Sequence, residues 1–207
     1  MPPAPPRPSP SGLTVLALLG AGPLHPYAMQ RLIKTWGKDE VVNIGQRANL
    51  YKTIRRLHEA GLIAVRQTER AQQYPERTVY EVTEEGRSTG MRWLRDMLAI
   101  PRNEYPAFPA ALSFAMVLDP DEVAGELARR LAAIQDRLAR LDSQLQGYRE
   151  AVPRIVLIET EYQHAVVQAE ARWLSSVIDD LKSGKLAWDH DQIAAQAAET
   201  FFQAAGS

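Results

Sequence analysis

Residues 49–63 read NLYKTIRRLHEAGLI, and this stretch decides the fold. Leu50, Ile54 and Leu57 recur at helical spacing, so one side of a helix faces a core. Gly61 then ends the helix, because glycine readily adopts the left-handed conformation that follows a helix. We therefore predict a helix from about Gln46 to Ala60. Its opposite side is polar and largely basic, and holds Ala48, Asn49, Lys52, Arg55, Arg56 and Glu59, with Arg47 and Tyr51 on the flanks.

The segments around this helix predict a winged helix-turn-helix. Ser11 and Pro26 are typical of helix starts, and so indicate two short helices before it. Residues 62–65 and 78–82 have strand composition and flank a long polar tip, which predicts a β-hairpin. Thr83 precedes two acids and is expected to cap a fourth helix that ends near residue 100. Helices, hairpin and final helix in this order, within about 90 residues, are the winged-helix layout.

The second half of the chain is expected to be helical, which makes the fold mainly α. Prolines at 101, 106 and 109 indicate a linker, and Asp119-Pro120 is a strong helix start. We predict five segments: a disordered proline-rich tail at 1–11, a winged-helix domain at 12–100, a linker at 101–109, a helical dimerisation domain at 110–185 and a C-terminal tail at 186–207.

A heptad of apolar residues runs along the first long helix of the second half. Such a stripe packs on a partner helix. That partner could be residues 153–181 of the same chain or a helix across a dimer axis, and we favour the second. The expected dimer interface contains Leu127, Leu131, Ile134, Leu138, Leu141, Leu145, Trp173 and Val177.

Charge and residue type together point to double-stranded DNA as a partner. The net charge is −1, yet residues 1–100 sum to +5 and residues 101–207 to −6. Arginine can pair with guanine and asparagine with adenine in the major groove, while lysine neutralises phosphate. From the helix and the hairpin we expect DNA contacts by Arg47, Asn49, Tyr51, Lys52, Arg55, Arg56, Arg66, Arg70, Gln72 and Arg77. A winged-helix adaptor that binds only proteins is the alternative.

Several other classes are not expected. The chain has no cysteine, and its four histidines are scattered. Glu161 and His164 form a Glu-x-x-His pair, but a di-iron bundle needs a second copy, so we expect neither metal nor cofactor. Enzyme signatures such as Gly-x-Ser-x-Gly and phosphate loops do not occur. The longest apolar run, residues 13–19, is too short to span a membrane, and the first twelve residues are no secretory signal, so we expect a cytoplasmic protein.

Trp93, Met97 and Phe108 could line a cavity for a small aromatic or apolar effector. Aromatic and methionine side chains adapt well to such ligands. Plain core packing is the alternative for all three residues.

Four motifs carry a family resemblance. They are VLALL at 15–19, GPLHPY at 22–27, the stretch 49–63 and YEVTEEGR at 80–87. In this order they resemble the PadR-like transcriptional regulators, over roughly residues 12–100. The resemblance implies a homodimeric cytoplasmic repressor on a near-palindromic operator, with a helical C-terminal dimer interface. It also implies that Tyr27 faces DNA beside Asn49, Tyr51, Lys52 and Arg55. Ala48-Asn49 departs from the Gly-Ser or Gly-Thr that the family commonly has there, so the operator sequence does not carry over.

Overall fold

The computed structural model describes residues 7–38, 41–44, 47–69 and 77–189. The chain divides into two units, Met1–Asn103 and Glu104–Ser207. Part of the expected proline-rich tail, residues 1–6, and most of the expected C-terminal tail, residues 190–207, lie outside the described residues.

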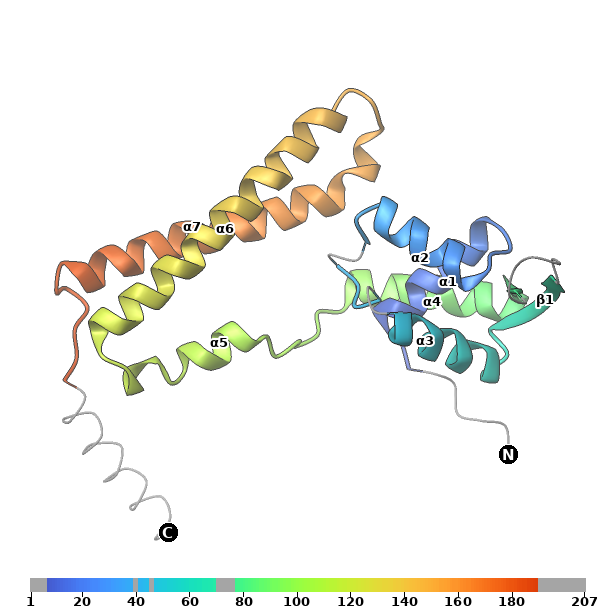
Figure 1. Ribbon diagram of the computed structural model, residues 1–207, viewed down its shortest axis with the longest axis horizontal. Helices are drawn as coiled ribbons and strands as arrows, with labels where there is room; N and C mark the ends of the chain where they lie inside the picture. Colours follow the sequence, from blue (N-terminus) through green and yellow to red (C-terminus); the bar gives the residue numbers. More distant parts are fainter. Residues whose placement is uncertain (1–6, 39–40, 45–46, 70–76, 190–207) are drawn as a thin grey trace, which may run out of the picture. The chain divides into compact units, whose positions relative to one another are not determined.

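The first unit is a winged helix-turn-helix (Figure 1). Its elements in chain order are α1 (Pro10–Ala21), α2 (Pro26–Thr35), α3 (Arg47–Glu59), β1 (Ile63–Glu69), β2 (Arg77–Val82) and α4 (Glu84–Ala99). The predicted start of α1 was wrong by two residues. Ser9, and not Ser11, caps the helix, because its side chain accepts a hydrogen bond from the Gly12 amide at 3.2 Å. Pro10 fits the first turn, where no amide donor is needed.

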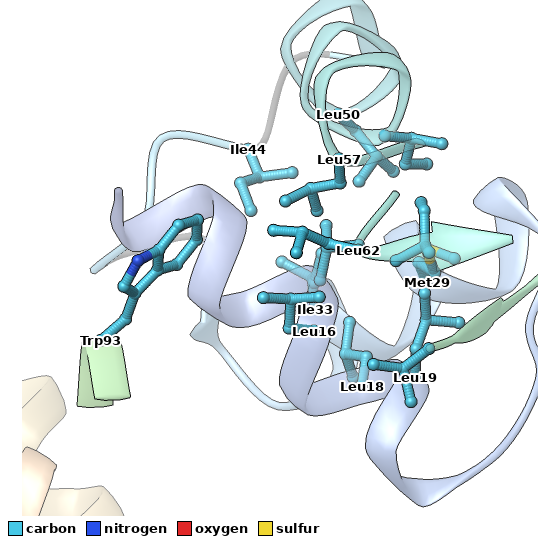
Figure 2. Packing of buried hydrophobic residues seen from close by; sticks show 14 residues of the cluster. Leu16, Leu18, Leu19, Met29, Ile33, Ile44, Leu50, Leu57, Leu62 and Trp93 are labelled. Carbon is cyan, nitrogen blue, oxygen red and sulfur yellow. The ribbon is translucent and has the colours of Figure 1, made fainter. Parts of the chain in front are cut away.

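Side chains from all four helices and the hairpin form one core (Figure 2). Leu50 and Leu57 point from α3 toward Leu16 and Leu62, as their spacing predicted. Burial of each such side chain stabilises the unit by about 1.5–3 kcal/mol relative to an exposed one. Because α3 contributes this whole side to the core, its opposite side is left to solvent.

The wing is an antiparallel pair in which Ile63 lies opposite Val82. The register of the pair shifts between Val65 and Gln67 of β1. Leu24 adds a short bridge to Tyr80, with N–H···O distances of 3.0 Å in both directions. These two hydrogen bonds join the loop before α2 to the second strand of the wing.

The second unit is a helical hairpin. It comprises α5 (Ala107–Leu112), the short η2 (Ala115–Val117), α6 (Pro120–Tyr148), η3 (Arg154–Val156) and α7 (Ile158–Lys182). α5 begins inside the segment 101–109, for which we expected a linker. Pro109 is compatible with this helix because it lies in the first turn, where amides have no intrahelical acceptor.

α6 and α7 run side by side in this unit (Figure 1). Leu127 of the heptad stripe lies in one buried cluster with Leu174 and Ile178 of α7, and Leu131 and Ile134 pack at its edge. The stripe therefore packs within the chain, and our preference for pairing it across a dimer axis was wrong. The connection between the helices, residues 149–157, contains η3 and is short enough to bring their apolar faces together at little cost in entropy.

Candidate nucleic-acid interface

The outer side of α3 is a basic, solvent-exposed surface. Lys52, Arg55 and Arg56 are exposed, whereas Leu50 and Ile54 on the other side are buried. Glu59 is the single acidic residue of the helix. Five of the ten DNA-contact residues expected from the helix and hairpin thus lie exposed on one helix; they are Arg47, Tyr51, Lys52, Arg55 and Arg56.

Two contacts organise the start of α3. The Arg47 guanidinium lies 5.4 Å from the centre of the Tyr51 ring, and its Nη2 is 3.4 Å from the Tyr51 hydroxyl. Asn49 is half-buried, and its Nδ2 is 3.3 Å from Oδ1 of Asn43 in the preceding loop. The same Nδ2 also donates to the Asn43 backbone carbonyl at 3.5 Å. These bonds hold the amide in one orientation and leave its oxygen for a base edge.

α2 adds a second basic row that our sequence reasoning only partly found. Tyr27, implied by the resemblance, is 65% exposed. Arg31 and Lys34 follow at helical spacing and are exposed too, but we did not name them. The spacing of 27, 31 and 34 was the signal that could have identified them. At the start of this helix, the amide of Ala28 donates a hydrogen bond to His25 Nδ1 at 3.0 Å.

In the wing, the structure describes one basic side chain, that of Arg66. Arg66 is exposed, and its Nη1 lies 3.6 Å from the Glu81 carboxylate on the paired strand, which partly offsets its charge. Arg70 and Gln72 lie outside the described residues, as does the side chain of Arg77. The expected contacts of the hairpin tip therefore stay predictions.

Comparison with known proteins agrees with this geometry. Residues 15–91 match the model of the Transcriptional regulator PadR-like family. The first unit thus resembles the PadR-like family over these 77 residues. A comparison with curated proteins finds no match.

Solved structures share the fold of this PadR-like chain. Bacillus subtilis PadR in complex with operator DNA is 18% identical with a TM-score of 0.65, and the match covers 82% of this chain and 98% of that one. The Bacillus cereus regulator BC1756 is 17% identical with a TM-score of 0.58, covering 84% and 99%. Vibrio cholerae AphA, a virulence activator, is 19% identical with a TM-score of 0.62, covering 84% and 98%.

The residues expected around an effector belong to different units of the PadR-like chain. Trp93 is only 3% exposed and lies in the core of the first unit, against α1, with Met97 at the edge of that core (Figure 2). Phe108 belongs to the second unit, where the Arg130 guanidinium stacks 3.6 Å from its ring centre and Trp173 meets it edge-on at 6.1 Å. Trp93 thus acts as a core residue.

The Glu-x-x-His pair of α7 has other partners. Arg154 donates to both oxygens of Glu161, with Nε at 3.1 Å, and His164 Nε2 lies 2.8 Å from Asp142 of α6. In the described part of the PadR-like chain, no three metal-ligating side chains come together. None of the helices in that part combines the length and apolar character needed to cross a bilayer.

Proposed function

We propose that this PadR-like chain is a cytoplasmic transcriptional repressor that binds a near-palindromic operator as a homodimer. The observation that carries the proposal is the outer side of α3, where Lys52, Arg55 and Arg56 are exposed beside Asn49. Positive charge on an exposed helix attracts phosphates, and the width of the major groove admits such a helix.

Each side chain has a role that its chemistry suits. Asn49 would pair with adenine and so would read sequence. Lys52 and Arg55 would neutralise phosphates, which adds affinity without reading bases. Arg31 and Lys34 of α2 would contact the DNA backbone, because the first helix of a helix-turn-helix crosses it.

The outer side of α7 supports the homodimer. Tyr162 is 71% exposed and Trp173 is 44% exposed, and they share one side with Val166, Ala169 and Val177. Val177 packs at the edge of the α6–α7 core, and Phe108 meets one edge of Trp173. Tyr162, Val166 and Trp173 nevertheless remain largely exposed, and exposed apolar rows of this kind mark interfaces.

The spacing of this row favours an antiparallel pair of α7 helices. Tyr162 and Val177 are almost equally far from Ala169 along the helix, and so are Val166 and Trp173. A twofold axis beside Ala169 would place Tyr162 of one protomer opposite Val177 of the other, because the two sides of such an interface are the same surface. The small side chain of Ala169 would let the helices approach closely. In this arrangement Trp173 and Val177 would lie in the dimer interface for which the sequence predicted them.

A small aromatic or apolar effector is a second part of the proposal. Bacillus subtilis PadR, which shares this fold, has been solved in complex with p-coumaric acid. An effector would weaken operator binding by favouring an arrangement of the two DNA-binding units that does not match the operator. Added p-coumaric acid should then lower operator affinity; unchanged affinity would remove this compound as the effector.

Titration of the purified protein against labelled duplex from upstream of its own gene tests the function. We expect saturable binding that single-base changes weaken at particular positions, by about 1–3 kcal/mol each. Lack of duplex binding at physiological salt would instead support the protein–protein adaptor. Transcription of that promoter in vitro separates repression, which lowers transcript yield, from activation, which raises it.

A further inference from the structure

A hollow of about 430 Å³ lies between α3 and the second strand of the wing. Tyr51, Lys52, Arg55 and His58 of α3 form one wall, and Tyr80 of β2 forms the other. We did not name His58 or Tyr80 as DNA contacts from the sequence. The hollow adjoins the basic side of α3, so a ligand of that surface also meets this space.

The polar groups of this lining favour an anion. It contains an ammonium, a guanidinium, an imidazole and two phenol hydroxyls, and no carboxylate. All five groups can donate hydrogen bonds. A hollow of this volume is larger than a phosphate group and accommodates part of the attached sugar. The DNA backbone, which presents phosphates in a row, is the matching partner.

The two residues differ in how firmly they are held. Tyr80 is half-buried, and its backbone pairs with Leu24 on one side and Val65 on the other. His58 is exposed and lies edge-on to the Tyr80 ring, with ring centres 6.2 Å apart. The aromatic contact limits where the imidazole can lie, so it stays on the wall of the hollow.

We propose that a phosphodiester of bound DNA occupies this hollow, with Tyr80 and His58 as contacts beyond Lys52 and Arg55. This inference rests on the proposed function. His58 binds phosphate best as an imidazolium, because a charged donor makes the stronger bond. Histidine side chains change charge near pH 6.5, so the contact makes DNA affinity depend on pH.

The groups around His58 do not add a charge change of their own to the pH dependence of DNA affinity. The other polar groups of the lining are a lysine, an arginine and two tyrosines, which are residue types that do not change charge near neutral pH. Glu59, next to His58 on α3, is a glutamate, and this residue type does not change charge there either. α1, which also packs on α3, has no titratable side chain, and neither α2 nor β1 contributes to the lining. His58 is the one histidine in the lining of the hollow, and histidine is the side-chain type whose charge changes near neutral pH.

The test is duplex affinity at pH 6 and pH 8 at fixed ionic strength, by fluorescence anisotropy. If the site prefers the imidazolium tenfold, affinity falls by roughly sixfold per protomer between the two values. His58→Gln should bind weakly at both pH values and lose most of this slope. His58→Arg should bind tightly at both, because its charge is permanent. Tyr80→Phe should weaken binding equally at both.

His164→Gln, on α7, is the matched histidine control and should retain the wild-type slope. If His58→Gln keeps that slope, the inference is overturned while DNA binding itself stands. Lack of any duplex binding would overturn the proposed function as well. Inorganic phosphate, added at constant ionic strength, distinguishes the sources: strong competition at millimolar concentration would indicate a free-phosphate site, which also contradicts the inference.

Discussion

Gly86 of α4 lies directly against the backbone carbonyl of Leu62, at the junction of the wing and the helix. A Cβ atom at position 86 would be 1.9 Å from that oxygen. The same carbonyl accepts a hydrogen bond from the Thr83 amide at 3.1 Å, and the Thr83 hydroxyl donates to the Gly61 carbonyl at 2.8 Å. The end of α3, the start of the wing and the start of α4 thus form one closely packed joint that positions the basic side of α3.

Gly86→Ala should destabilise the first unit by about 3 kcal/mol, because backbone must move to admit the methyl group. Gly90→Ala is the matched control on the same helix, where a Cβ would meet Leu16 at an ordinary 3.5 Å. There alanine should stabilise by roughly 0.5–1 kcal/mol through its helix propensity. Urea unfolding followed by tryptophan fluorescence measures both, and equal effects of the two substitutions would contradict the close approach.

Replacing Lys52 and Arg55 together by alanine should flatten the salt dependence of DNA binding. Each lost phosphate contact lowers the slope of log affinity against log salt by about 0.9, so a dimer should lose up to about four. Lys182→Ala, on the exposed last turn of α7, removes a cation remote in sequence and should leave the slope unchanged. A slope unaffected by the double substitution would show that α3 does not face DNA.

Val166→Glu should convert the dimer into a monomer of 23.1 kDa, the mass of one chain. The substitution places a charge within the row on α7, where an interface would desolvate it. Ala133→Glu introduces the same charge on the exposed side of α6 and should leave the dimer intact. Sedimentation velocity at micromolar concentration distinguishes the species, and a wild-type monomer would refute the homodimer itself.

The Arg154–Glu161 pair should make a small, pH-dependent contribution to the second unit. Hydrogen bonds from Arg154 lower the pKa of Glu161 in the folded chain. This contribution is therefore present above the ordinary glutamate pKa, about 4.3, and is lost as the pH falls through the lower folded value. Glu161→Gln should slightly lower the melting temperature at pH 7 and have no effect near pH 2. An equal effect at both pH values would mean that the charge is not involved.

A single introduced cysteine tests the antiparallel pairing across the twofold axis, because the chain has no cysteine of its own. Ala169→Cys should form a disulfide between protomers under mild oxidation, since a residue beside the axis lies near its own copy. Arg129→Cys, exposed on α6, should remain reduced. A dimer in which Ala169→Cys does not cross-link would contradict this register but not dimerisation.

Most of the first unit could be predicted because its signals are local. The apolar spacing of Leu50, Ile54 and Leu57, the glycine after α3 and the Thr83 cap each depend on a few neighbouring residues. Trp93 shows where such reasoning ends. An aromatic residue at helical spacing suits a core and a ligand cavity equally, and only its packing against α1 distinguishes them.

By itself, then, the sequence determined which elements form and which side of α3 is polar, since periodicity and capping act over a turn or two of helix. Tertiary structure alone decided that the α6 stripe is buried against α7 of the same chain, and that His58 and Tyr80 face one hollow. The reason is physical: an apolar stripe or an exposed imidazole has no intrinsic partner, and what it meets depends on how segments far apart in the chain are brought together.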